Sequence, residues 1–312
     1  MTDQEHLWER RVITKLAQAS LKEQRRARRW SIFFKFLVFA YITFVLFAFL
    51  EPDFTTTKIA TKHTALVELQ GIIADDEKAS ADNIVSALRS AFEDEKTRGV
   101  ILRINSPGGT PVQAGYIYDE IVRLRELYPD TPLYAVISDM AASGGYYVAS
   151  AADEIYANKA SIVGSIGVRM DSFGLVEAME KLGIERRTLT AGENKALLDP
   201  FAPINEEAVK HVQTMIDDIH QQFITAVKDG RGDRLKEIDG LFSGLIWTGQ
   251  EAVEFGLVDK LGSASYVARE VVGEEEIMEY AVEEDVLERL VDRLGASTAS
   301  ILSKELISPR MQ

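Results

Sequence analysis

From residue 65 onward, strand-like and helix-like segments alternate along the chain, and this order restricts the fold to one class. Residues 65–73 have the apolar composition of a strand, whereas residues 81–94 place apolar side chains at helical spacing. A helix between successive strands returns the chain to the start of a parallel neighbour. The sequence therefore predicts an α/β domain with mainly parallel strands and interleaved helices.

Three later segments of the alternation are also assigned from their residue patterns. A breaker-rich loop is expected to precede a helix over residues 116–128, and a short strand is expected over residues 185–190. A long helical segment follows Asn205, which is a preferred N-cap residue.

Residues 31–50 form an apolar segment with Lys35 as their single charge. As a helix, this segment is long enough to cross a hydrocarbon core of roughly 30 Å. A cleaved signal peptide has a shorter apolar run that ends in small residues, whereas this run ends in FVLFAFLE. We therefore expect an uncleaved, single-pass transmembrane helix.

Charge is unevenly distributed along the chain. Residues 1–30 carry eight Lys/Arg against four Asp/Glu, although the whole chain has a net charge of −14. Basic flanks stay on the cytoplasmic side of a membrane, so we expect a cytoplasmic N-terminus and a periplasmic or extracellular acidic domain. The lipid bilayer is an expected partner, and nucleic acid is not.

The expected organisation has five parts. They are a basic tail (1–30), a transmembrane anchor (31–50), a tether (51–62), the main domain (63–270) and a C-terminal helical extension (271–312). The extension is assigned because Leu287, Leu290, Val291 and Leu294 recur at helical spacing.

Several kinds of site are excluded or not indicated by composition and motifs. The chain has no cysteine, which excludes disulfides, thiolate metal sites and a cysteine nucleophile. It contains no HExxH, GxxxxGK[ST] or GxGxxG motif, so we expect neither a metal nor another cofactor. The four histidines, His6, His63, His211 and His220, are interpreted as surface or packing residues.

Ser143 follows a predicted buried strand, residues 133–137, and precedes two glycines and a small-residue helix. A helix N-cap would explain this serine in isolation, whereas a nucleophilic serine needs a neighbouring base. A lysine can be that base where burial lowers the pKa of lysine from about 10.4 toward neutrality. The candidate is Lys195, for which an exposed loop lysine is the alternative reading.

Two loops contain backbone amides that could stabilise a developing negative charge on oxygen. Gly144 follows Ser143, and Gly109 lies in the segment RINSPGG after a predicted strand. An oxyanion hole needs N–H groups of this kind. An ordinary turn explains the Pro-Gly-Gly segment equally well.

Five motifs occur in one order: RINSPGG, AASGGYYVA, GSIGV, GENKALLDPF and WTGQEAVEFGLVDKLG. Together they resemble the signal peptide peptidase A family, bacterial membrane-anchored Ser-Lys proteases, over about residues 60–265. The resemblance implies a Clp protease/crotonase-like fold. It further implies that Ser143 is the nucleophile, Lys195 the general base and Ser165 the residue that holds the lysine amine. Gly109 and Gly144 would supply the oxyanion amides.

The same resemblance implies a function and an assembly. The function is a serine endopeptidase that degrades apolar peptides, such as cleaved signal peptides, through an acyl-enzyme. A homo-oligomer is implied because longer relatives hold two such units in one chain. A non-catalytic Clp-like membrane quality-control scaffold and a crotonase-type acyl-CoA enzyme are the alternatives. Ala196 differs from the polar residue of some relatives.

Overall fold

The computed structural model describes residues 3–50 and 61–281. The described residues belong to two units, residues 3–50 and residues 61–281. In the first unit a single helix, α1, runs over Asp3–Leu50. Within the described residues, no helix combines the length and the mean hydropathy needed to cross a membrane.

The second unit is built on one sheet. Within residues 61–281 the sheet has eight strands: β1 (His63–Gln70), β2 (Thr97–Ser106), β3 (Leu133–Ala142), β4 (Glu154–Ala157), β5 (Ile162–Gly164), β6 (Ile246–Thr248), β7 (Lys260–Leu261) and β8 (Ile277–Tyr280). Their order is β6-β5-β3-β2-β1-β8, and β4 pairs with β3 and β7. All pairings are parallel except that of β5 with β6. The predicted α/β class with a mainly parallel sheet is therefore confirmed.

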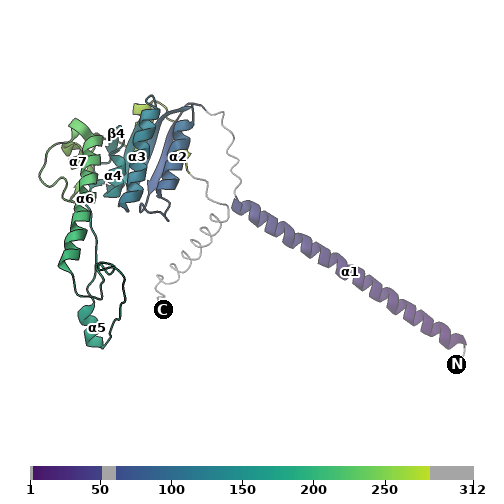
Figure 1. The fold of residues 1–312 in the computed structure, drawn as a ribbon. Helices are drawn as coiled ribbons and strands as arrows, with labels where there is room; N and C mark the ends of the chain where they lie inside the picture. The colour runs from purple at the N-terminus through teal and green to yellow at the C-terminus, as the bar shows by residue number, and fades with distance from the viewer. Residues whose placement is uncertain (1–2, 51–60, 282–312) are drawn as a thin grey trace, which may run out of the picture. The chain divides into compact units, whose positions relative to one another are not determined.

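Helices cover one face of this sheet and form the larger core. They are α2 (Ala81–Glu93), α3 (Pro111–Leu127) and α4 (Gly144–Ala149), and α2 and α3 lie side by side in Figure 1. Ile84, Leu88 and Phe92 of α2 are buried there, because their spacing puts them on one helix face. The opposite face packs on a smaller cluster from α8 (Ala264–Tyr266) and the π-helical turn η2 (Val267–Val272). Burial on both faces explains why the central strands are almost continuously apolar.

Helix α3 begins earlier than the sequence indicates. The expected loop before residue 116 ends at Thr110, whose side chain accepts a hydrogen bond from the Gln113 amide. Pro111 is the first helical residue, where its fixed φ is compatible with a helix and no amide proton is required. The capping residue and the proline therefore add a turn to this helix.

Residues 168–205, which we name the arm, extend from the sheet and its covering helices, as Figure 1 shows. The arm contains the short helix α5 (Val176–Leu182). The strand expected over residues 185–190 does not form. These residues are exposed, Leu189 to 99%, and no strand lies beside them among the described residues. An isolated extended segment lacks the ladder hydrogen bonds that stabilise a strand.

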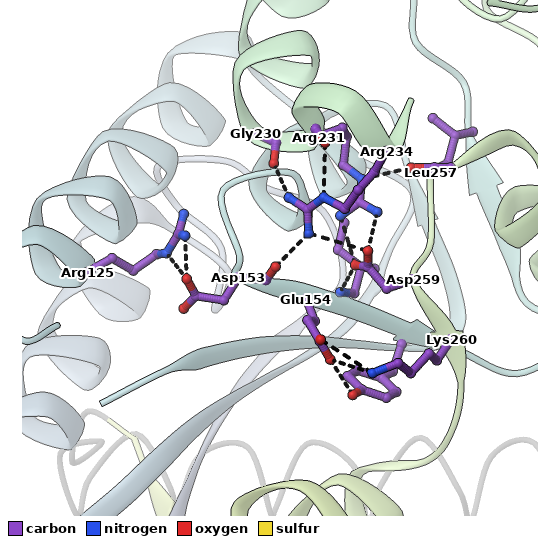
Figure 2. A network of polar contacts seen from close by, with 12 residues as sticks. Arg125, Asp153, Glu154, Gly230, Arg231, Arg234, Leu257, Asp259 and Lys260 are labelled. Atoms are coloured by element: carbon purple, nitrogen blue, oxygen red, sulfur yellow. Dashed lines mark hydrogen bonds and ion pairs between the residues drawn. The ribbon is translucent and has the colours of Figure 1, made fainter. Parts of the chain in front are cut away.

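The long helix α6 (Glu206–Arg231) confirms the expectation based on Asn205, whose side chain accepts hydrogen bonds from the Glu207 and Ala208 amides. At its other end, Arg231 is fully buried and donates to both carboxylate oxygens of Asp259 at 2.8 and 2.9 Å. Arg234 of η1 (Gly232–Arg234) joins the same carboxylate (Figure 2). This network attaches the end of α6 to the sheet.

Asp259 itself is held in place from two sides. Its Oδ2 also accepts the Ile155 amide of β4 at 2.7 Å. Burial opposes ionisation of Asp259, but the hydrogen bonds and charge of Arg231 outweigh it and lower the pKa of this carboxyl below its ordinary value.

The C-terminal part of the described chain differs from the predicted helical extension. Residues 277–280 form β8, which pairs in parallel with β1 at the edge of the sheet. The sheet therefore continues past the expected domain boundary at residue 270. The rest of the expected extension, including Leu287 and Leu290, lies outside the described residues.

Candidate active site

Ser143 and Ser165 lie next to each other at the carboxyl edge of the sheet. Ala142 of β3 pairs with Gly164 of β5, and each serine is the next residue along its chain. The Ser143 amide donates to the Gly164 carbonyl at 2.9 Å, and the Ser165 amide donates to the Leu245 carbonyl at 2.7 Å. Two serines from separate motifs are thus brought together by strand pairing.

Both serines have unusual backbone conformations. Ser143 has φ 52° and ψ −125°, and Ser165 has φ 53°. Residues with side chains rarely adopt positive φ, and such strain costs on the order of 1–3 kcal/mol at each position. Strain of this size persists where the surrounding structure enforces it, and it is concentrated at functional sites.

The amides of Gly109 and Gly144 are close together beside Ser143. A Cβ placed on Gly144 would lie 3.2 Å from the Gly109 nitrogen, and one on Gly109 would lie 2.0 Å from the Ile73 carbonyl oxygen. Glycine is therefore required at residue 109. Within residues 61–281 the structure records no hydrogen bond donated by either amide. The pair matches the requirement for an oxyanion hole.

These four residues line one cavity of about 740 Å³. Its remaining wall combines apolar and polar groups. The apolar residues are Pro107, Pro111, Ala114, Tyr147, Val168, Ile219 and Phe223, and the polar ones are Arg169, Gln222 and Ser243. Among the described residues that line it there is no histidine. The cavity can accommodate an apolar side chain next to the Ser143 hydroxyl.

Lys195 does not line this cavity. It is exposed in the arm, between Asn194 and Ala196, which line a separate cavity of about 440 Å³ between the arm and the start of α6. Of the five residues predicted for the site, the structure brings together Ser143, Ser165 and the two glycines, and leaves the lysine apart.

None of the three histidines with described side chains lines the cavity. His63 is buried at the start of β1, where its Nε2 lies 2.9 Å from the Tyr280 hydroxyl and its Nδ1 lies 3.0 Å from the Thr61 carbonyl. His220 contacts the Ile166 carbonyl at 3.1 Å, and His211 is exposed on α6. The side chain of His6 lies outside the described residues.

Sequence reasoning did not identify the residues that shape the cavity and support the serines. Tyr147 and Phe223 have ring centroids 4.9 Å apart, although they come from helices far apart in the chain. Trp247 of β6 packs on Gly164, because a Cβ there would lie 3.0 Å from the indole Cδ1. The apolar stripe of α6 was the available signal for Phe223, and it indicates burial without indicating a site.

The comparisons with known proteins identify a family. Residues 126–277 match the family described as Peptidase family S49. A putative protease of Synechocystis is 34% identical over 212 residues, covering 68% of this chain and 73% of that protein. The chain belongs to peptidase family S49. The matched range contains Ser143, Ser165 and Lys195, whereas Gly109 lies before it.

Other similar proteins are matched over a smaller share of their own length. A putative signal peptide peptidase of Enterococcus faecium is 32% identical over 211 residues, covering 65% of this chain and 61% of that protein. A protein of Brucella abortus, named Na⁺/H⁺ antiporter, is 44% identical over 189 residues. That match covers 60% of this chain and a quarter of the Brucella protein, 25%. The expected membership of the signal peptide peptidase A family is confirmed.

Proposed function

We propose that this S49 member is a membrane-bound serine endopeptidase in which Ser143 is the nucleophile and Lys195 the general base. One observation carries the proposal. Ser143 occupies a strained turn in a cavity where the Gly109 and Gly144 amides are close together and donate no recorded hydrogen bond within residues 61–281. That arrangement has the parts needed for acyl transfer.

The proposed reaction has two halves. The neutral Lys195 amine takes the Ser143 proton as the hydroxyl oxygen attacks the peptide carbonyl, and the two glycine amides bind the resulting oxyanion. The protonated lysine then gives its proton to the leaving amine, which leaves an acyl-Ser143. Water, activated by the same lysine, hydrolyses this ester and regenerates the serine. The Ser165 hydroxyl, at the cavity wall, would orient the lysine amine.

The lysine of each site would come from a second copy of the chain. This part is supported by the exposed position of Lys195 outside the cavity and by the exposed apolar side chains of the arm, among them Phe173 and Leu189. An arm with such a surface is expected to pack against another protein surface. A homo-oligomer would then complete the dyad.

The proposed substrates are apolar peptides, such as cleaved signal peptides. The apolar side chains in the cavity wall, among them Tyr147, Ile219 and Phe223, support this class, and a relative carries the name signal peptide peptidase. The anchor remains part of the proposal because residues 31–50 contain one charge in twenty residues. With the basic tail in the cytoplasm, the peptidase domain would face the periplasm or the extracellular space.

Hydrolysis of a fluorogenic apolar peptide by the full chain tests the catalytic proposal. We expect turnover by the wild type and none by Ser143→Ala, while Ser90→Ala, an exposed serine on α2, is unaffected. Turnover that persists in the Ser143→Ala chain would reject Ser143 as the nucleophile.

Mixing two inactive variants tests the shared site. Ser143→Ala chains and Lys195→Ala chains, mixed before assembly, should regain part of the activity, because some sites then join an intact serine to an intact lysine. An absence of rescue would place both residues of the dyad in one chain.

A non-catalytic membrane scaffold is the second candidate, and the exposed Lys195 outside the cavity favours it. Such a protein would bind apolar peptides in the same cavity without cutting them. Peptide binding with no detectable hydrolysis by the wild-type chain would support the scaffold.

A further inference from the structure

The loop that bears Lys195 consists of consecutive turns. The Lys195 amide donates to the Gly192 carbonyl at 3.2 Å, the Leu197 amide to Asn194 at 3.2 Å and the Asp199 amide to Ala196 at 3.3 Å. Residues 192–197 are exposed and belong to no helix or strand. Turns of this kind permit many conformations unless contacts outside the loop restrict them.

Asp199 supplies such contacts at the end of the loop. Its side chain is 9% exposed, and its Oδ1 accepts hydrogen bonds from the Arg186 guanidinium and from the Phe201 amide, the latter at 3.1 Å. The Arg186 guanidinium also lies over the Phe201 ring, 4.8 Å from its centroid. We name Arg186, Asp199 and Phe201 the clamp. It joins the chain before the loop to the chain after it.

Two further features fix the same end of the loop. Leu198, directly before Asp199, has φ 54°, which a leucine adopts only where its surroundings enforce it. The Leu175 amide donates to the Pro200 carbonyl at 2.7 Å, which attaches this end to the start of α5. The strained Leu198 and the Asp199 of the clamp are therefore adjacent, three and four residues after Lys195.

We propose that the clamp positions the Lys195 amine for catalysis. This inference rests on the proposed function, in which Lys195 is the base for Ser143. Proton transfer needs the amine within hydrogen-bond reach of the hydroxyl, and small misplacements of a catalytic group cost large factors in rate. The clamp residues are positioning residues, because they act through the loop and touch no reacting atom.

Kinetics of full-length variants provide the first test. Asp199→Asn and Arg186→Gln should lower kcat at least tenfold and leave KM within twofold, because the peptide binds in the Ser143 cavity and the clamp affects the base. Arg187→Gln is the matched control, since Arg187 pairs with Glu185 at a highly exposed position in the same segment. An unchanged kcat in both clamp variants would overturn the proposal, as would an effect on KM alone.

Phe201→Leu is a further variant that keeps the ion pair and removes the stacked ring. It too should lower kcat without changing KM. Trypsin should cleave after Lys195 faster in Asp199→Asn than in the wild type or in Arg187→Gln. A released loop combined with a normal kcat would contradict a positioning role.

Mixing experiments show whether the clamp acts with Lys195 or with Ser143. Asp199→Asn chains should regain activity when mixed with Ser143→Ala chains, which supply an intact clamp and lysine, and should not regain it with Lys195→Ala chains. Rescue by Lys195→Ala chains would show that Asp199 acts with Ser143, and would overturn the proposal.

The two proposals fail in different ways. Normal turnover by Lys195→Ala would reject the lysine as base and, with it, the clamp. An inactive Lys195→Ala beside a fully active Asp199→Asn would reject the clamp alone. If the dyad lies within one chain, the kcat and KM of the clamp variants decide the question.

Discussion

The backbone strain at Ser143 can be measured independently of the chemistry of its hydroxyl. Alanine at this residue keeps the unfavourable φ of 52°, whereas glycine adopts it freely. Ser143→Gly should therefore be more stable than Ser143→Ala by about 1 kcal/mol, although both lack the proposed nucleophile. Urea denaturation measures the difference.

At Ser90, in the interior of α2, the alanine variant should be the more stable of the two. Glycine there is expected to be less stable than alanine by about 1 kcal/mol, because it has the lower helix propensity. The same order of stability at both positions would contradict the strain argument for Ser143.

The dyad should behave as a unit in kinetics. Ser143→Ala and Lys195→Ala should each reduce kcat by at least about a thousandfold, and the double variant should lose little more. Additive losses in the double variant would show that the two residues act independently.

Activity should rise with pH, because an amine accepts a proton only in its neutral form. Replacing His211 and His220 together by Gln should leave the rate within about twofold, since neither lines the cavity. A pH–rate profile of kcat/KM for both proteins checks this. A large loss in a folded His211→Gln/His220→Gln chain would restore histidine as a candidate base.

At the scale of elements, the attachment of α6 depends on one buried carboxylate. Asp259→Asn leaves the fully buried Arg231 uncompensated and should destabilise the domain by about 3–5 kcal/mol. Lys260→Gln is the control, because its pair with Glu154 is exposed and should contribute less than about 1 kcal/mol (Figure 2). Equal losses in the two variants would contradict this account.

The same carboxylate gives a pH dependence of stability. The pKa of Asp259 is lower in the folded chain than its ordinary value of 3.8, so folding favours the ionised form. The resulting stabilisation is complete about one pH unit above 3.8. It is lost as the pH falls from there through the lower pKa of the folded chain. Denaturation at pH 6 and pH 3 should show a smaller loss for Asp259→Asn than for the wild type.

Some of these elements could be predicted from sequence and others could not, for physical reasons. The apolar spacing of Ile84, Leu88 and Phe92 defines α2, and a strand end located Ser143, whereas Ser165 was found only through the family resemblance. Residues 185–190 have a strand-like composition, but a strand needs a partner, which local sequence does not specify. β8 lies in an acid-rich segment with a weak strand signal. The separation of Lys195 from the cavity depends on the path of the arm.

At the scale of the whole molecule, the proposed anchor has a direct test of orientation. A periplasmic-active reporter fused after Gln312 should be active, and N-terminal sequencing of the mature protein should begin before residue 31. A mature protein that begins shortly after residue 50 would instead identify residues 31–50 as a cleaved signal.

The mass of the native particle should show whether the chain forms an oligomer. Native mass measurement of the full chain in detergent is expected to give a closed multimer, because a site that takes its lysine from a neighbour needs at least two copies. A strictly monomeric chain with full activity would contradict the shared site.

The hydrogen bond from the Ser165 amide to the Leu245 carbonyl also determines when the proposed active site can form. During synthesis, the segments around Ser143 and Ser165 emerge long before Leu245 and β6. Until β6 joins the sheet, the Ser165 amide lacks this acceptor, and the neighbouring Ser143 turn lacks that support. Under the proposed function, a chain still in synthesis would therefore carry no assembled nucleophile, and activity would begin only after β6 has paired with β5.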